Sequence, residues 1–198
     1  MSPVIGILAL QGGVREHERS LDKLGVTHRQ VRRPNQLLGL DGIILPGGES
    51  TTISRLLELG GVLEPLRAAL AKGLPAYGTC AGMILLANQV RDTRADAHQL
   101  NALDITVRRN AFGRQIDSFE ADLDFVGIDA PVPAVFIRAP WVEQVGEGVE
   151  VLAVVQEGPA AGAVVAVRAG NVLASSFHPE VTGDTRLHEL FMEIVRAS

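Results

Sequence analysis

Apolar runs that end in glycine turns, each followed by a segment with helical spacing, make up the first half of the chain. Residues 4–10 (VIGILAL) are apolar throughout and end at Gln-Gly-Gly, which predicts a strand buried on both faces. Residues 14–25 then bring Val14, Leu21 and Leu24 to one side of a helix. The alternation continues with predicted strands at 26–31, 41–48 and 74–78, and with predicted helices at 50–73, interrupted at Gly60-Gly61, and at 80–90. Strand, glycine turn and helix repeated in this order predict an open, mostly parallel α/β sheet flanked by helices.

The second half has a different pattern, in which short strand-like runs follow one another with little helical spacing between them. We expect these runs to form an antiparallel extension of the sheet; they lie at 103–107, 134–139, 149–156, 162–170 and 171–177. The chain ends in a predicted amphipathic helix at 185–197, whose apolar face holds Leu187, Leu190, Phe191, Ile194 and Val195. Because no repeat or long linker divides the sequence, residues 1–198 are predicted to form one domain.

Composition narrows the classes of function. With 198 residues, 46% of them apolar and 21% charged, the chain is long enough to bury a substantial core. Its net charge of −5 and its lack of a long basic run argue against nucleic acid and anionic membranes as partners. The single cysteine excludes an internal disulfide and any multi-cysteine metal site. Residues 4–10 are too short for a membrane span and lack the basic flank of a signal peptide, so we expect a cytoplasmic protein.

The cysteine lies in Gly78-Thr79-Cys80-Ala81-Gly82, between a predicted strand and a predicted helix. The pattern G-x-C-x-G has the form of a nucleophile elbow, in which small neighbours permit a sharp strand-to-helix turn. The helix amino terminus favours a thiolate there, and the Ala81 N–H is expected to point toward a developing oxyanion. The alternative interpretation is that Cys80 is a small buried side chain, as a lone intracellular cysteine usually is.

Of the five histidines, His178 is the best candidate for a catalytic base. It follows a predicted strand, as Cys80 does, and Pro179 restricts it to extended conformations. In an extended segment Glu180 projects to the same side and would fix the tautomer of the imidazole, the role of the third member of a triad. The alternative is a strand-end histidine beside a solvated carboxylate. The other histidines are expected in a helix, a strand, a polar stretch and the solvated side of the terminal helix, and are His17, His28, His98 and His188.

Two further segments carry candidate binding groups. Residues 45–51 (LPGGEST) form a second glycine turn after a strand, where Gly48 can supply another oxyanion N–H. The spacing is not that of a phosphate loop, and the plain alternative is a turn with a Ser50 or Thr51 helix cap. A carboxylate could be held by one of three arginines, which are Arg109, Arg114 and Arg138.

Together, the strings LPGGEST, YGTCAGMILLA and FHPE resemble the class I, triad-type glutamine amidotransferases, whose fold is flavodoxin-like. Within that class, LALQGGVREH, RRPNQL, RNAFGRQIDSFEADL and FIRAP resemble the glutaminase subunits of pyridoxal 5′-phosphate synthases. The resemblance runs from residue 4 to the terminal helix. One departure is DAHQLNALDITV, where Asn101 and Ala102 replace a glycine-containing turn, so the shape of the 92–102 loop stays open.

The resemblance implies hydrolysis of L-glutamine to glutamate and ammonia, with no metal and no organic cofactor. Cys80 would attack the amide carbon and form a γ-glutamyl thioester, while His178 transfers the proton and Glu180 orients the imidazole. Backbone N–H groups near Gly48 and Ala81 would hold the oxyanion. The substrate contacts that the family's motifs imply are Gly48, Glu49, Ser50, Arg109, Ile137 and Arg138.

The resemblance also implies a partner, because ammonium is not a nucleophile and ammonia must pass directly to an acceptor. In this family the acceptor is a (β/α)8-barrel synthase subunit, and docking completes the oxyanion hole of a weakly active glutaminase. Gln11, Gly12 and Gly13 lie at the expected active-site edge and are candidates for that docking. Two alternatives stay open: a glutaminase subunit of another amidotransferase, such as imidazole glycerol phosphate synthase, and a non-hydrolytic α/β protein with a redox-sensing cysteine.

Overall fold

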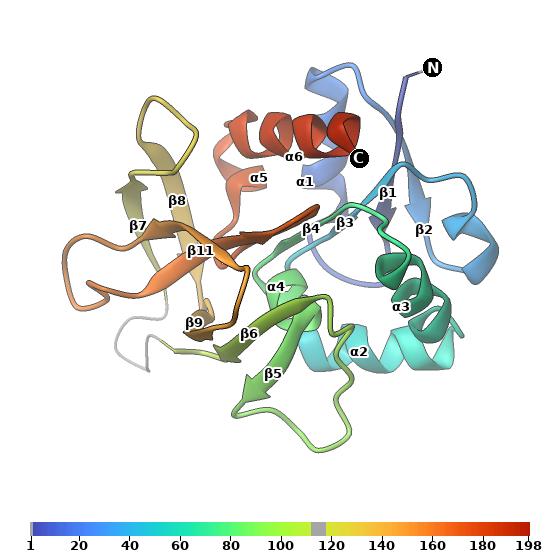
Figure 1. Ribbon diagram of the computed structural model, residues 1–198, viewed down its shortest axis with the longest axis horizontal. Coiled ribbons are helices and arrows are strands. Elements are labelled where there is room, and N and C mark those ends of the chain that lie inside the picture. The colour runs from blue at the N-terminus through green and yellow to red at the C-terminus, as the bar shows by residue number, and fades with distance from the viewer. Residues whose placement is uncertain (1, 112–117) are drawn as a thin grey trace.

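The computed structural model describes residues 2–111 and 118–198, and these residues form a ten-stranded sheet with helices on both faces and a second, two-stranded sheet (Figure 1). The strand order in the large sheet is β2-β1-β3-β4-β12-β11-β9-β6-β5, and β10 pairs with β11 off this path. Its strands are β1 (Val4–Leu8), β2 (Thr27–Val31), β3 (Gly42–Leu45), β4 (Ala76–Thr79), β5 (Ala87–Arg91), β6 (Leu103–Arg108), β9 (Trp141–Val145), β10 (Glu150–Val154), β11 (Val164–Ala169) and β12 (Val172–Ser175). The small sheet consists of β7 (Ser118–Leu123) and β8 (Val132–Ile137). The helices are α1 (Val14–Lys23), α2 (Ser50–Leu59), α3 (Leu63–Ala71), α4 (Ala81–Leu86), α5 (Pro179–Thr182) and α6 (Arg186–Ala197), with a 3₁₀ turn η1 (Pro34–Leu37).

One side of the large sheet is parallel, as the alternating pattern of the first half predicts. β1 pairs in parallel with β2 and β3, β3 with β4, and β4 with β12. Every residue of β3 and β4 is buried, because helices cover both faces of this part of the sheet. The predicted open, mostly parallel α/β architecture is confirmed.

The last strand, β12, joins the two parts of the sheet. It pairs antiparallel with β11, as expected, but it also pairs in parallel with β4, and its register places Ser175 opposite Thr79. The Cys80 N–H continues this pairing by donating to the Ser175 carbonyl oxygen at 2.8 Å. The residues that follow β4 and β12 therefore meet beyond the carboxyl ends of these strands, where ligand sites form in α/β folds.

The antiparallel extension predicted for the second half is present, with two departures. β11 pairs antiparallel with β9 and β10, and β9 pairs antiparallel with β6. At the far edge, however, β5 and β6 are parallel. The run at 134–139 was expected in the extension, but it belongs to β8 of the small sheet, where Ala134 and Phe136 are buried in the core beside α6. The apolar side chains of β8 are buried against the large sheet, although among the described strands β8 pairs only with β7.

The helix expected at 80–90 is shorter than its sequence pattern indicates. α4 ends at Leu86, and from Ala87 the chain forms β5. The chain returning from β5 satisfies a carbonyl at the end of the helix, since the Leu100 N–H donates to the Leu85 carbonyl oxygen at 2.6 Å. This bond also fixes the loop between β5 and β6, whose shape the sequence leaves open.

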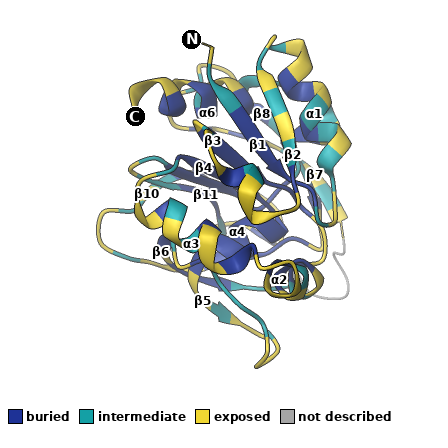
Figure 2. Ribbon diagram, turned by 90° about the vertical axis from the view of Figure 1, so that its right-hand side faces the viewer, coloured by how far each residue is buried: buried dark blue, intermediate teal, exposed yellow. Residues whose placement is uncertain are grey.

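Two apolar cores lie on opposite faces of the large sheet. One core contains residues of α2, α3 and α4, and the other contains residues of α1, α6, β7 and β8. Along β3 the side chains alternate between the two, with Ile43 and Leu45 in the first core and Ile44 in the second. Figure 2 shows the result, in which buried strands lie between helices whose outer faces are exposed. Within the described ranges, no helix is long and apolar enough to cross a membrane.

His188 lies on the buried face of α6, so the expectation of a solvated position is wrong. Its side chain is fully buried, as are Phe191 and Met192, which follow it by three and four residues. Residues at these spacings share one face of a helix, so the apolar face of α6 includes His188. The His188 Nε2 has a partner from another part of the chain, whereas the Nδ1 has none among the described residues.

Gly82 marks the point where α4 begins against the end of β3, and we expect it to tolerate no side chain. A Cβ there would lie 2.1 Å from the Leu45 carbonyl oxygen. Because backbone would have to move in a close-packed core, Gly82→Ala should lower the free energy of unfolding by about 3 kcal/mol or more, measured by urea denaturation with circular dichroism. The matched control is Gly158→Ala, where a Cβ meets nothing within 4 Å. Its positive φ alone should cost about 1 kcal/mol, and equal losses in the two variants would contradict the packing argument.

Candidate active site

Cys80 occupies a strained turn between β4 and α4. Its backbone has φ of 47° and ψ of −100°, a region that residues other than glycine seldom adopt. Gly78 and Gly82 make the turn possible, because a Cβ on Gly78 would lie 2.6 Å from the Gly82 carbonyl carbon. Cys80 is 7% exposed and immediately precedes the first turn of α4. This is the geometry of a nucleophile elbow.

His178 and Glu180 are hydrogen-bonded to each other just beyond the end of β12. The His178 Nδ1 lies 2.8 Å from the Glu180 Oε1, and the Glu180 side chain is almost completely buried. The expected extended geometry is not what brings them together, because α5 begins at Pro179 and Glu180 stands in its first turn. Proline favours the first position of a helix, and His178 is the non-helical residue before it. The sequence-predicted pair therefore meets through a helix start rather than a strand.

The backbone at Gly47 lies close to the side chains of both His178 and Cys80. A Cβ on Gly47 would lie 2.3 Å from the His178 Cε1 and 3.3 Å from the Cys80 Cβ. The side chains of His178 and Cys80 thus flank the same backbone position, the first from the segment after β12 and the second from the turn after β4. Any side chain at residue 47 would displace the imidazole.

Burial and hydrogen bonding act on the pKa of His178 in opposite directions. Burial, the largest influence, lowers this pKa, but the hydrogen bonds to Cys80 and Glu180 and the charges of both groups outweigh burial and raise the pKa to about 10. For Glu180, burial favours the neutral acid, while the electrostatic influence of His17 and the hydrogen bond with His178 lower the pKa overall. His178 therefore lies between Cys80 and the Glu180 carboxylate, and its raised pKa favours the imidazolium form.

These groups open into a cleft of about 500 Å³. Its lining contains every predicted catalytic and substrate-contact residue, namely Cys80, His178, Glu180, Gly48, Glu49, Ser50, Arg109, Ile137 and Arg138. Ala81 is buried at the start of α4, directly after the nucleophile. Arg114, the third candidate arginine, lies outside the described residues. Among the residues that are described, no group of three or more histidine, cysteine or acidic side chains is arranged to hold a metal ion.

Glu49, rather than Ser50 or Thr51, caps helix α2. Its Oε2 accepts the Thr52 N–H at 2.8 Å, and its Oε1 lies 2.9 Å from the Arg109 Nη2. Burial raises the pKa of Glu49, but hydrogen bonds from Thr51 and Thr52 outweigh burial and lower the pKa to about 2. A fixed carboxylate and a guanidinium thus stand side by side at the rim of the cleft.

Sequence reasoning proposed Gln11 only for docking, and it missed the structural roles of His17 and Thr79. The Gln11 Oε1 accepts the Glu49 N–H at 2.8 Å and would lie 2.4 Å from a Cβ on Gly48. His17 and Thr79 are fully buried behind the catalytic groups. The signal for His17 was present, because it falls between Val14 and Leu21 on the apolar face of the first helix, where a polar residue requires a buried partner.

Comparison with known proteins finds relatives over the whole chain. A profile of the SNO glutamine amidotransferase family matches residues 7–197. The pyridoxal 5′-phosphate synthase subunit PdxT of Nocardia farcinica is 63% identical over 197 residues, which cover 99% of this chain and 87% of the relative. The subunit of the same name from Corynebacterium jeikeium is 63% identical over 193 residues, covering 98% of this chain and 97% of the relative. A crystal structure described as a glutamine amidotransferase matches with a TM-score of 0.90 and 46% identity, covering 97% of this chain and 98% of that chain.

The titration of His178 provides a direct test of this arrangement. Followed by NMR, the imidazole should titrate near pH 10, and the midpoint should fall in Cys80→Ala, which removes a hydrogen bond and a negative charge. Since the folded pKa is raised above the ordinary value of 6.5, His178 stabilises the fold fully below that pH and loses this contribution as the pH rises toward 10. Ser54→Ala, a buried change on α2, is the control and should leave the midpoint unchanged. An unchanged midpoint in Cys80→Ala would contradict the contact.

Proposed function

Because this chain belongs to the SNO glutamine amidotransferase family, we propose that it hydrolyses L-glutamine to L-glutamate and ammonia as the glutaminase subunit of a pyridoxal 5′-phosphate synthase. The observation that carries the proposal is the meeting of Cys80, His178 and Glu180 in one cleft, at the carboxyl edge of β4 and β12. A cysteine at a nucleophile elbow with a carboxylate-bound histidine is suited to acyl transfer from an amide. One domain comprising residues 1–198 would carry the whole reaction.

Hydrolysis begins with attack of the Cys80 thiolate on the side-chain amide carbon of glutamine. With its pKa raised to about 10, His178 starts as the imidazolium and donates its proton to the departing ammonia as the C–N bond breaks. The neutral imidazole then takes a proton from the water that attacks the γ-glutamyl thioester, and the C–S bond breaks to release glutamate and the thiolate. Glu180 keeps the Nδ1 side of the ring occupied, so that Nε2 performs both proton transfers.

Two backbone N–H groups are the candidates for holding the oxyanion that forms during attack. One belongs to Ala81, the residue after the nucleophile, and the other lies at Gly48 in the glycine turn. The position of Gly48 on the cleft wall and of Ala81 at the start of α4 supports this assignment. The Gln11 Oε1 accepts the Glu49 N–H and lies beside Gly48, so Gln11 is placed to influence the conformation of the glycine turn.

The rim of the cleft matches the zwitterionic end of an amino acid. Arg109 presents a guanidinium for the α-carboxylate, and Glu49 beside it presents a carboxylate for the α-ammonium group. These two side chains pair with each other, so bound substrate would replace one ion pair by two. Ser50, Ile137 and Arg138 complete the proposed set of contacts on the cleft wall.

Ammonia produced in the cleft requires an acceptor at hand, because it is protonated and lost as a nucleophile in neutral water. The relatives named as pyridoxal 5′-phosphate synthase subunits favour a synthase partner over the acceptors of other amidotransferases. We propose that this partner is a (β/α)8-barrel subunit that receives ammonia directly. The exposed apolar residues Ile137 and Val181, which both line the cleft, are suited to being covered by it. The proposed reaction uses no metal and no organic cofactor.

Substitution of the catalytic groups provides the first functional test. With the cognate synthase subunit present, Cys80→Ala should release no glutamate from L-glutamine above background, because the nucleophile is gone. His178→Asn should lose activity by about a hundredfold or more, and Glu180→Gln by less, since an orienting group is removed rather than the proton carrier. If the unmodified chain with its partner releases no more glutamate than Cys80→Ala, the glutaminase assignment fails.

The proposed carboxylate contact has its own test. We expect Arg109→Ala to raise the KM for glutamine about tenfold or more with a smaller change in kcat, because a charge-assisted hydrogen bond to the substrate is lost. Arg108→Ala is the matched control, since Arg108 pairs with Glu143 and Asp92 and does not line the cleft. Equal KM values for the unmodified chain and Arg109→Ala would rule out this role.

A further inference from the structure

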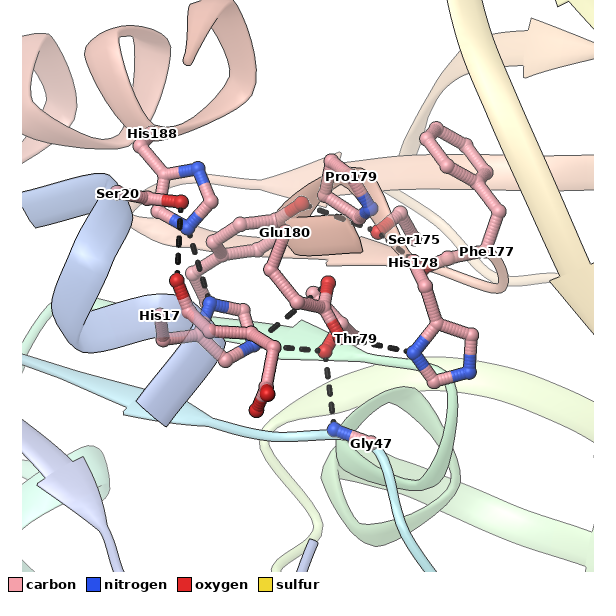
Figure 3. Close-up of polar contacts among 12 residues, drawn as sticks. His17, Ser20, Gly47, Thr79, Ser175, Phe177, His178, Pro179, Glu180 and His188 are labelled. Atoms are coloured by element: carbon pink, nitrogen blue, oxygen red, sulfur yellow. Dashed lines mark hydrogen bonds and ion pairs between the residues drawn. The ribbon is translucent and has the colours of Figure 1, made fainter. Parts of the chain in front are cut away.

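A buried polar network lies directly behind the catalytic residues (Figure 3). The His17 Nδ1 lies 2.9 Å from the His188 Nε2, and the His17 Nε2 lies 3.2 Å from the Thr79 Oγ1. Thr79 in turn accepts the Gly47 N–H at 3.0 Å. His17, His188 and Thr79 are all fully buried. The network therefore links α1 and α6 to the glycine turn that separates the thiol from the imidazole.

The outer oxygen of Glu180 faces this network. While Oε1 is bonded to His178, Oε2 is buried without a hydrogen-bond partner among the described residues, and the His17 Nε2 lies 3.8 Å from it. Figure 3 shows the carboxylate between the rings of His17 and His178. A buried carboxylate oxygen with no hydrogen bond is costly, so the polar group nearest to it matters for its charge and orientation.

His17 and His188 are both neutral in the folded protein. Burial is the main cause that lowers the pKa of each, reinforced by His178 for His17 and by His17 for His188. The acidic groups that act in the opposite direction are Glu180, Glu16 and Asp184, and they do not outweigh burial. A neutral imidazole acts on Glu180 through its N–H dipole rather than through a full charge. Which ring nitrogen carries the proton therefore decides the effect.

Two tautomers of His17 are possible, and electrostatics separates them. With the proton on Nε2, the N–H points at Thr79 and the Glu180 carboxylate, and Nδ1 accepts from the His188 Nε2–H. With the proton on Nδ1, a lone pair faces the carboxylate instead. In the first tautomer the His188 Nδ1 is a lone pair without a partner and the Thr79 hydroxyl hydrogen is not directed at His17, whereas the second tautomer leaves a buried N–H without a partner at the His188 Nδ1, which is rarer in proteins.

We infer that His17 is a positioning residue for catalysis: its Nε2–H donates to Thr79 and, at 3.8 Å from the Glu180 Oε2, holds the carboxylate ionised and turned toward His178 by electrostatic attraction, and through Thr79 it fixes the Gly47 turn. This role rests on the proposed glutaminase reaction, because it acts on Glu180 and not on substrate. His17 contacts neither the cleft nor the nucleophile, so its removal is expected to affect kcat and the proton equilibria of the triad more than substrate binding.

Two conservative variants of His17 separate this role from simple packing. In His17→Gln the amide nitrogen reaches the place of Nε2 and keeps a donor toward Glu180, whereas in His17→Asn the amide reaches only the place of Nδ1. With the synthase subunit present, His17→Asn should lower kcat for glutamine hydrolysis about tenfold or more with KM changed by less than about twofold, and His17→Gln should recover most of that loss.

The pH profile gives a readout that packing alone would not move. Without the Nε2–H the Glu180 carboxylate is harder to ionise, so the acid limb of kcat/KM should move to higher pH in His17→Asn. A less well-held carboxylate raises the pKa of His178 less, so the alkaline limb should move to lower pH. The pH range over which kcat/KM is high should therefore become narrower at both ends in His17→Asn and stay unchanged in His17→Gln. Ser54→Ala, the buried control on α2, should leave both kcat and the limbs unchanged.

Equal kcat values and equal pH limbs in His17→Asn and His17→Gln would overturn the inference. If His17→Asn does not fold, Thr79→Val and Thr79→Ser provide the same comparison, since only serine keeps the hydroxyl; equal kcat in those two would overturn it as well. The NMR midpoint of His178, measured in the same variants, needs no enzymatic activity. If the unmodified chain releases no glutamate, the proposed function is contradicted. If the NMR midpoint of His178 does not change when the His17 donor is lost, this inference is contradicted.

Discussion

The parallel pairing of β12 with β4 is the contact on which the site depends. It joins segments 98 residues apart in sequence, as the buried hydrogen bond between Tyr77 and Ser175 at 3.1 Å illustrates. Because the register sets Ser175 opposite Thr79, the next residues of both strands leave the sheet at the same edge. A slip of one residue would turn the side chains of β12 to the opposite faces and carry His178 away from the thiol. The apolar cores on the two faces of the sheet make such a slip costly, so packing and catalysis are set by the same register.

Charge at this edge is stabilised by geometry rather than by solvent. The His178 imidazolium lies between Cys80 and a nearly buried carboxylate, an arrangement that burial alone would oppose for both His178 and Glu180. Three backbone devices keep the groups in place: the strained turn at Cys80, the helix start at Pro179, and the glycine turn at Gly47 that leaves room for the ring. Each device is local, and the β12–β4 pairing brings all three together.

The sequence predicted those parts of the fold that depend on local pattern. The apolar runs and glycine turns of the first half predicted the parallel strands, and the G-x-C-x-G string predicted the elbow, because small residues are required wherever backbone segments approach closely. The shortening of α4 was not predicted, since it depends on a hydrogen bond from the returning chain at Leu100. The separate β7–β8 sheet was missed for a similar reason, because an apolar strand pattern does not state which sheet will receive it.

The candidate site likewise contains residues that a local pattern predicts and residues whose role depends on tertiary contacts. Cys80, His178 and Glu180 carry chemistry in their residue types and spacing, so they could be proposed from sequence. The importance of His17 depends on what lies beside it, and its partners His188, Thr79 and Glu180 come from three other elements. The prediction that His188 is solvated was wrong because it followed from the polar residue type. The helical spacing, which places His188 on the same face as Phe191, predicts the buried position that is observed.

The neutral histidine pair behind the triad also makes the fold sensitive to acid. The pKa of His188 is about 3 in the folded chain and near 6.5 when the chain is unfolded. Between these two pH values His188 is therefore protonated in the unfolded chain and neutral in the folded chain. The free energy of unfolding therefore declines as the pH falls below 6.5, and the lowered pKa of Glu180 adds to the decline below its ordinary value of 4.5. Acidification is therefore expected to weaken the packing of α1 and α6 on the sheet at this polar network, which lies behind the proposed catalytic groups.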